Sequence, residues 1–271
     1  MEAKYETLEL ELADEVATVS LNRPPLNLFS PKMVGELIDV WHSFRNNRKV
    51  RFVILTAKGE NFSGGADLKE IKKLINGQEL LPENARYQQL AGHEMMRSLE
   101  SLEQVTVAAL RGAVIGAGMA VAMACDFRIM AEGSYFSVPE SIVGVYFTWG
   151  STPRLVRLVG ASRAMEIIMT CDPIPAPEAY RVGLANKIVP KDRLLEATRE
   201  WVAKIASRSP TAVRITKKIA LGASMQGFGN MFICEPELMQ GLAFTGETQE
   251  GIEAFLEKRS PRYKKGERSK T

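Results

Sequence analysis

The chain has 271 residues, of which 45% are hydrophobic and 25% are charged, and its formal net charge is +3. This composition is typical of a soluble globular protein that is long enough to bury a substantial core. No apolar run approaches the ~18 residues of a membrane span, and the acidic start (Met1-Glu2-Ala3-Lys4) is unlike a signal peptide. We therefore expect a cytoplasmic protein without a membrane partner.

The charge is distributed unevenly along the chain. Residues 258–271 carry seven Lys or Arg and one Glu, so this segment has a charge of +6 and the rest of the chain −3. Because no basic stripe is interleaved with aromatic residues, we expect no nucleic-acid partner. The basic tail is either solvated or a docking site for a phosphorylated ligand. Three cysteines without metal-type spacing and two distant histidines predict no metal site and a reducing compartment.

The first quarter of the chain alternates strand and turn signals before a helix begins. Residues 5–12 and 16–21 are short β-type runs on either side of Asp14-Glu15, which predicts a hairpin. Ser30-Pro31 predicts a helix start, with serine as the N-cap and proline in the first turn. The apolar residues of this helix recur at helical spacing, namely Met33, Leu37, Val40, Trp41 and Phe44.

Two glycine-rich turns carry the strongest functional signal. The first, at residues 61–68, follows a buried strand at 52–55, and the second, at residues 112–118, follows a strand at 106–110. Each turn opens a helix, with Asp67 as a capping residue in the first, so backbone N–H groups are free where the helix dipole is positive. If the two turns converge, they form an oxyanion hole of main-chain donors. Spacing alone does not show convergence, and either turn by itself is most often a connection.

The middle of the chain continues with helix and strand signals. Residues 76–84 have the composition of a mobile surface segment, and a long helix is expected from about residue 85 to 102. Residues 119–124 are uncharged and mostly small, which predicts a helix buried on all sides. A strand at 126–131 and a loop at 136–140 follow.

The final part of the chain, from Leu155 onward, has the pattern of a nearly all-helical region. We therefore predict an α/β core over residues 1–190 that carries the site and a helical region over residues 191–271 that serves oligomerisation and closure. The chain lacks a GxGxxG fingerprint after the first strand and a GxxxxGK[ST] motif, which removes the usual dinucleotide and nucleotide-phosphate interpretations.

Taken end to end, these segments resemble the crotonase family, the enoyl-CoA hydratase/isomerase proteins. The resemblance covers almost the whole chain in order. The matching pieces are residues 21–24, 62–70, 112–126, 136–140 with Gly144, Arg154-Leu155, Ala179 with residues 183–184, and residues 250–259.

The resemblance carries expectations for both fold and chemistry. It implies an α/β spiral of ββα units with a C-terminal helical region, assembled as a homotrimer or a dimer of trimers. It also implies an enzyme that forms an enolate from an acyl-CoA thioester, with coenzyme A as part of the substrate and no other cofactor. Position by position, the oxyanion donors would be the backbone N–H groups of Ala66 and Ala117, and the catalytic carboxylate would be Glu140.

The same resemblance suggests where the substrate lies. The first loop and Lys69 would follow the CoA arm, and a C-terminal helix, often from a neighbouring subunit, would close over the nucleotide end. The bulky aromatic residues within 145–150 should shape the acyl pocket, for a short, cyclic or flat acyl group. The predicted substrate-binding residues are Leu26, Asp67, Leu68, Lys69, Gly118, Phe147, Trp149, Phe255 and Lys258.

The sequence departs from the hydratases of this family at one decisive position. Those enzymes hold a water between two glutamates, and the first glutamate corresponds here to Ala120, whereas the second is Glu140. Water addition needs both a base and an acid. A single carboxylate can instead take a proton from C2 and return one to C4. The sequence therefore slightly favours double-bond isomerisation of the Δ3,Δ2-enoyl-CoA isomerase type, with burial raising the pKa of Glu140.

Other activities stay open. A hydratase, including one for cyclic dienoyl-CoA substrates, would need a substitute acid–base group, for which His93 and Tyr146 are the candidates. Dehalogenation is disfavoured because Thr148 stands where 4-chlorobenzoyl-CoA dehalogenase, a family relative, has a nucleophilic aspartate. The family's decarboxylase and hydrolase activities stay open. Loss of one carboxylate also fits a catalytically weak acyl-CoA-binding homologue. The sequence does not distinguish acyl length or ring, pathway, or trimer from hexamer.

Overall fold

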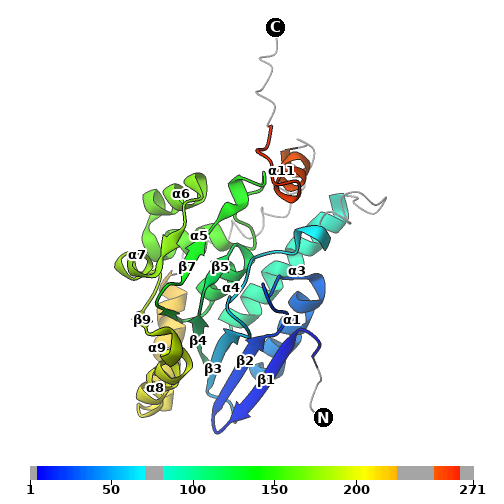
Figure 1. The fold of residues 1–271 in the computed structure, drawn as a ribbon. Coiled ribbons are helices and arrows are strands. Elements are labelled where there is room, and N and C mark those ends of the chain that lie inside the picture. The colour runs from blue at the N-terminus through cyan, green and yellow to red at the C-terminus, as the bar shows by residue number, and fades with distance from the viewer. Residues whose placement is uncertain (1–4, 71–81, 225–246, 263–271) are drawn as a thin grey trace.

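A computed structural model describes residues 5–70, 82–224 and 247–262. It contains a six-stranded sheet in the order β1-β2-β3-β4-β6-β9 and a three-stranded sheet in the order β5-β7-β8, with helices packed around them (Figure 1). The strands are β1 (Leu8–Ala13), β2 (Val16–Leu21), β3 (Phe52–Ala57), β4 (Val105–Leu110), β5 (Ala113–Ile115), β6 (Phe127–Ala131), β7 (Tyr135–Ser137), β8 (Ile174–Pro175) and β9 (Lys187–Val189). The helices are α1 (Pro31–Arg45), α3 (Pro82–Glu100), α4 (Ala117–Ala124), η1 (Pro139–Ser141), α5 (Ser151–Val159), α6 (Ala161–Thr170), α7 (Ala176–Arg181), η2 (Lys191–Arg193), α8 (Leu194–Ala206), α9 (Pro210–Ser224) and α11 (Glu247–Leu256).

The large sheet starts with the predicted hairpin and then becomes parallel. Strands β1 and β2 are antiparallel, whereas β2 with β3, β3 with β4, β4 with β6 and β6 with β9 pair in parallel. Every residue of β3 and β4 is buried, as expected of parallel strands with both faces covered. This arrangement confirms the predicted α/β fold class.

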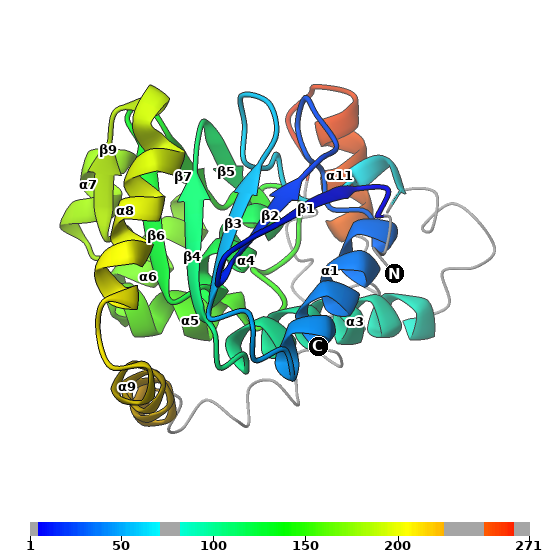
Figure 2. The same ribbon diagram turned by 90° about the horizontal axis from the view of Figure 1, so that it is seen from below.

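Alternate residues of the central strands point into two different cores. Val53 and Leu55 belong to the core shared with α1, α3 and α4, whereas Phe52 and Ile54 belong to the core shared with α8. This alternation follows from the two-residue side-chain period of a strand. Figure 2 shows α1 and α8 on opposite sides of the central strands. The sheet is thus enclosed between two helical layers.

The helix boundaries follow the capping signals closely. The Ser30 Oγ accepts a hydrogen bond from the Met33 N–H at 3.2 Å, which confirms the predicted start of α1. The Asp67 carboxylate accepts one from the Glu70 N–H at 3.4 Å, at the start of the helix after the first glycine turn. Helix α3 ends at Glu100, two residues before the predicted end. The segment predicted to be mobile, residues 76–84, lies mostly outside the described residues.

Four short strands occupy regions where the sequence predicted none, and the first of them, β5, lies within the second glycine turn. Strand β7 lies at the start of the predicted 136–140 loop, and β8 and β9 interrupt the region predicted to be nearly all helical after Leu155. Each is two or three residues long and is fixed by pairing with a distant strand: β7 with β5, β8 with β7 and β9 with β6. Strand formation at these places depends on tertiary pairing rather than on local pattern, so local pattern missed it.

The C-terminal helices do not form one separate layer. Helix α8 packs on β4 and β6, whereas α11 lies against the loop that follows η1. The division at residue 190 into a core and a C-terminal region stays a prediction. None of the helices in the described ranges combines the length and the apolar character that crossing a bilayer requires.

Candidate active site

The two glycine turns lie side by side. The Ser63 N–H donates to the Ala113 carbonyl at 3.0 Å, and the Ile115 N–H donates to the Ser63 carbonyl at 2.9 Å. Gly65 has a φ of +95°, and a Cβ atom at this position would lie 3.3 Å from the Ile115 carbonyl oxygen. The two turns, about fifty residues apart in sequence, therefore share a short stretch of backbone pairing, so their helix N-termini begin next to each other.

Each turn presents an amide without an acceptor. Within the described part of the chain, no acceptor is hydrogen-bonded to the N–H of Ala66 or of Ala117. Ala117 is the first residue of α4, and its N-cap residue Gly116 supplies no side-chain cap. A Cβ atom at Gly118 would lie 2.6 Å from the Ser63 Cβ, so the two turns can only be this close with glycine there. The free donors, together with the positive end of α4, can stabilise a developing oxyanion.

Glu140 lies on η1 and its carboxylate faces the second turn. A Cβ atom on Gly116 would be 2.7 Å from the Glu140 Oε1. The Glu140 Oε2 is buried and has no hydrogen-bond partner among the described residues. Burial raises the pKa of Glu140 to about 7, and its own backbone N–H only partly offsets this effect. The carboxylate is thus next to the residue that precedes the Ala117 donor, and it can hold or release a proton near neutral pH.

Helix α4 offers no second carboxylate. All eight of its residues are buried, as predicted for residues 119–124, and Ala120 is only 2% exposed. In the described residues, no neighbouring charge contributes to the shifted pKa of Glu140. The site therefore has one carboxylate with apolar surroundings rather than a carboxylate pair.

Aromatic residues follow Glu140 in the chain. Phe147 is fully buried, and Tyr146 and Trp149 are partly buried. The Trp149 indole lies on the backbone of α3 at Gly92, and its ring meets Phe29 edge-on with centroids 6.3 Å apart. Phe29 in turn pairs with Ala66, so Trp149 is linked by contacts to the first turn.

His93 follows Gly92 on α3 and is partly buried. Burial raises the pKa of Glu140, and neither His93 nor Tyr146 contributes a charge to this shift. Both roles stay predictions.

Around the first turn, the predicted substrate-binding residues have different environments. The Asp67 carboxylate forms an ion pair with Arg23 at 2.9 Å and caps the following helix, so it stabilises the turn. The Leu26 carbonyl accepts from the Gly64 N–H at 2.7 Å, while the Leu26 side chain is exposed. Leu68 is partly buried and Lys69 is exposed. Sequence analysis missed Arg23, although its position within the 21–24 match was a signal.

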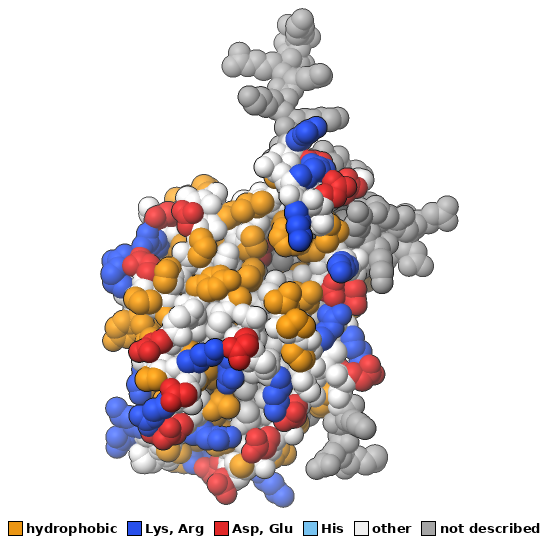
Figure 3. All heavy atoms as spheres, in the orientation of Figure 1, with side chains coloured by type: hydrophobic (Ala, Val, Ile, Leu, Met, Phe, Trp, Pro, Cys, Tyr) orange, Lys and Arg blue, Asp and Glu red, His pale blue; other side chains and the backbone are white. Residues whose placement is uncertain are grey.

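The last predicted residues lie near α11. Phe255 and Lys258 are exposed, at the end of this helix and just beyond it. The start of α11 contacts the loop after Glu140, because the Thr248 Oγ1 donates to the Gly144 carbonyl at 2.9 Å. Figure 3 shows basic side chains at this end of the molecule. The basic tail beyond residue 262 lies outside the described residues.

Across the described ranges, no group of three or more His, Cys, Asp or Glu side chains is arranged to hold a metal ion. Cys125 and Cys171 are free thiols and both are buried. Cys234 lies outside the described residues. The described residues place main-chain donors and the Glu140 carboxylate at this site.

Comparisons with known proteins show the family of the chain. The family model described as "Enoyl-CoA hydratase/isomerase" matches residues 11–266. The chain is 35% identical over 255 residues to the short-chain-enoyl-CoA hydratase of Clostridium acetobutylicum, covering 92% of this chain and 94% of that protein.

Two solved structures are also similar. An enoyl-CoA hydratase from Mycobacterium avium subsp. paratuberculosis superposes with a TM-score of 0.85 at 24% identity, covering 96% of this chain and all of that one, which supports the fold. A monofunctional enoyl-CoA isomerase from M. smegmatis has a TM-score of 0.68 at 29% identity, covering 84% of this chain and 98% of that one.

Proposed function

Because the chain belongs to the enoyl-CoA hydratase/isomerase family, an enzyme family that acts on enoyl-CoA, we propose that it moves a double bond within an unsaturated acyl-CoA thioester. In this proposal Glu140 is the only proton carrier. The reaction is the conversion of a 3-enoyl to a 2-enoyl thioester through a dienolate.

The backbone donors would hold the thioester oxygen. With the carbonyl between the Ala66 and Ala117 N–H groups, negative charge that develops on the oxygen is met by two fixed dipoles and the N-terminus of α4. This stabilisation makes the C2 proton more acidic. The Glu140 carboxylate, which neighbours Gly116, would then take the C2 proton and return it to C4.

The observation that carries the proposal is the isolation of the Glu140 carboxylate. Its Oε2 has no partner in the described residues, its pKa is raised to about 7 by burial, and the family's other glutamate position is the buried Ala120. A base of this pKa is suited to taking a proton and giving it back near neutral pH. A paired carboxylate that would hold a water is missing from α4.

Hydration is the second candidate, and the names of the relatives favour it. The Clostridium acetobutylicum relative is named as a short-chain-enoyl-CoA hydratase. A hydratase built on this chain would need another acid–base group, and His93 and Tyr146 are the first side chains to test.

The remaining parts of the proposal concern binding and assembly. We propose that Lys69 and Lys258, both exposed, bind the phosphates of coenzyme A, and that no cofactor beyond this part of the substrate is used. We also propose a homotrimer or a dimer of trimers as the assembly, which sedimentation would distinguish. These statements rest on the family resemblance.

Deuterium incorporation tests the reaction directly. The full chain is incubated in D₂O with 2-enoyl-, 3-enoyl- and cyclic dienoyl-CoA thioesters, and products are analysed by mass spectrometry. A deuterated product of unchanged formula supports isomerisation. A product heavier by one water overturns it in favour of hydration, and an absence of any change on all thioesters overturns both.

A further inference from the structure

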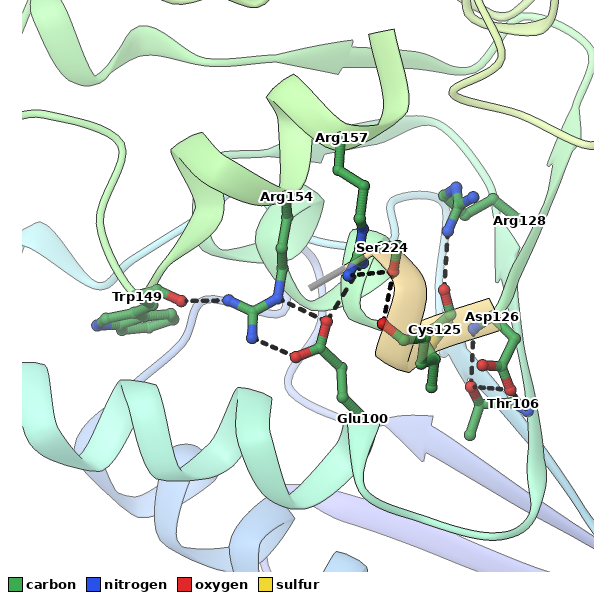
Figure 4. A network of polar contacts seen from close by, with 10 residues as sticks. Glu100, Thr106, Cys125, Asp126, Arg128, Trp149, Arg154, Arg157 and Ser224 are labelled. Atoms are coloured by element: carbon green, nitrogen blue, oxygen red, sulfur yellow. Dashed lines mark hydrogen bonds and ion pairs between the residues drawn. The ribbon is translucent and has the colours of Figure 1, made fainter. Parts of the chain in front are cut away.

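A buried ion pair lies behind the loop that carries the aromatic residues. The Arg154 Nε on α5 donates to the Glu100 Oε1 at the end of α3 at 2.8 Å, and the Arg154 Nη2 donates to the other carboxylate oxygen (Figure 4). The two side chains are only 4% and 5% exposed. Because desolvation offsets much of the attraction in a buried ion pair, its presence is weak evidence for a role in stability.

The remaining nitrogen of the same guanidinium reaches the loop itself. The Arg154 Nη1 donates to the Trp149 carbonyl at 2.8 Å. Trp149 has a φ of 58° and Gly150 a φ of 69°, so two consecutive residues are left-handed. For a bulky residue this conformation is strained and persists only where the surroundings hold it. A planar guanidinium fixed by Glu100 is a rigid donor for that purpose.

The position of the Trp149 indole also depends on a glycine of α3, which leaves space for the ring. A Cβ atom at Gly92 would lie only 2.1 Å from the Trp149 Nε1, so the ring occupies the space of a side chain on α3. The same ring meets Phe29 edge-on, with centroids 6.3 Å apart. The Phe29 backbone is hydrogen-bonded to the residues on both sides of Ala66. A displacement of the indole would therefore be felt at the proposed oxyanion donor.

We propose that the Glu100–Arg154 ion pair is a positioning device that fixes the Trp149 indole and thereby sets the acyl length that the pocket accepts. This inference rests on the proposed function, because it takes Trp149 as a wall of the acyl pocket. With the wall fixed, a short acyl group is held against Glu140. With the wall loosened, a short group loses its support and a long one gains space.

The test compares kcat/KM of the full-length enzyme for a short and a long 3-enoyl-CoA thioester, vinylacetyl-CoA and 3-decenoyl-CoA. Arg154→Met should lower the ratio of short to long by about 10- to 100-fold, the size of effect that a misplaced substrate produces. Arg157→Met is the matched control, because Arg157 donates to the same Glu100 at 3.4 Å from the side away from Trp149 (Figure 4). The control should leave the ratio unchanged.

Two further variants keep the test decisive if Arg154→Met does not fold. Gly92→Ala leaves the ion pair intact and displaces the indole, so it should change the ratio in the same direction. The triple variant Glu100→Gln, Arg154→Met, Arg157→Met removes the carboxylate together with both arginines paired with it and should do the same. Arg154→Lys should restore the ratio only in part, because lysine cannot bind Glu100 and the Trp149 carbonyl as a fork.

Fluorescence gives a readout that does not depend on catalysis. The difference in emission and acrylamide quenching between each chain and its Trp149→Phe version isolates Trp149 from the other two tryptophans. The signal should change in Arg154→Met and Gly92→Ala. An unchanged signal, together with equal losses on both thioesters, overturns the proposal and leaves a purely structural pair. If the reaction proves to be hydration, the same ratio is measured with 2-enoyl thioesters. Failure of the proposed isomerisation is thereby distinguished from failure of the positioning role.

Discussion

The two glycine turns meet at one place but are stabilised by different means. In the first turn the Ser63 hydroxyl donates to the Asn27 carbonyl at 2.9 Å and accepts from the Gly65 N–H at 3.0 Å, and Asp67 pairs with Arg23. The second turn has no side-chain cap at Gly116 and leads into the fully buried α4. The Asn61 Oδ1 accepts from the Ala113 N–H at the start of the second turn, at 3.0 Å, so the difference lies where the helices begin: the first start is held by polar side chains and the second is apolar.

This difference gives the two turns different roles in the proposed site. Polar side chains hold the buried first turn, which leads to the exposed Lys69. The second turn places Gly116, which has no side chain, next to the Glu140 carboxylate, and burial there raises the pKa of Glu140. Electrostatic interactions are also stronger in such a low-dielectric environment. We therefore expect changes at the second turn to have larger effects on activity than changes at the first.

The largest effect is expected for Glu140→Gln, which keeps the shape of the side chain and removes the proton carrier. Turnover should fall by about 10²–10⁴-fold, as for other general acid–base residues. The affinity for coenzyme A, measured by calorimetry, should stay the same because Glu140 is assigned no contact with it. Retention of full activity would remove Glu140 from the mechanism.

The next effect is expected for Ala117→Pro, which deletes the donor of the second turn. Proline is well tolerated at the first position of a helix, so α4 should still form. Loss of one oxyanion donor should lower kcat by about 10²–10³-fold. Ala66→Pro deletes the first donor but also lies beside the Phe29 pairing, so it should lose activity and thermal stability together. Unchanged kcat in both variants would rule out the backbone hole.

The pH dependence follows from the raised pKa of Glu140. A base must be deprotonated to act, so kcat/KM should rise with pH through about 7 and then level. The folded-state pKa lies above the ordinary value of 4.5, so this group favours folding below pH 4.5, and that contribution is lost as pH rises through about 7.

Glu140→Gln should then be more stable than the natural chain above pH 7. The expected gain is on the order of 3 kcal/mol, because each pKa unit corresponds to about 1.4 kcal/mol. Urea unfolding at pH 5 and pH 8 measures it. Equal stability differences at both pH values would mean that burial does not raise the pKa.

The smallest effect is expected for Arg23→Met at the first turn. The Arg23 side chain is 37% exposed, and such pairs are typically worth up to about 1 kcal/mol. We expect KM to rise by no more than about fivefold, in line with that energy, with kcat nearly unchanged. Steady-state kinetics measure both constants. A loss of kcat in Arg23→Met as large as that expected for Ala117→Pro would contradict the contrast between the two turns.

Much of the site is visible in the sequence because local signals specify it. The two glycine turns, the cap at Ser30 and the uncharged α4 are each encoded in fewer than ten consecutive residues. Their convergence is not, because it depends on parallel pairing of β3 with β4 and on the contact between Ser63 and Gly118. The raised pKa of Glu140 could be expected from its aromatic neighbours.

What the sequence could not show are partners that are far apart in the chain. Arg23 meets Asp67 across 44 positions, and Arg154 meets Glu100 across 54. Glycine at position 92 has no turn signal around it, since it lies within α3 and is needed only because the Trp149 ring rests there. Such contacts are properties of packed surfaces, and a single sequence contains no local pattern for them.

The contact of α11 with the loop after Glu140 bears on when the chain becomes active. A Cβ atom at Gly251 would lie 2.3 Å from the Val143 backbone, so this helix and the loop touch with no side chain between them. Chains fold from the N-terminus as they are synthesised. Since α11 follows every other described element in the chain, the loop after Glu140 is covered only after those elements have been made. Incomplete chains that stop before α11 would carry every proposed catalytic residue and still lack the surface that covers their loop.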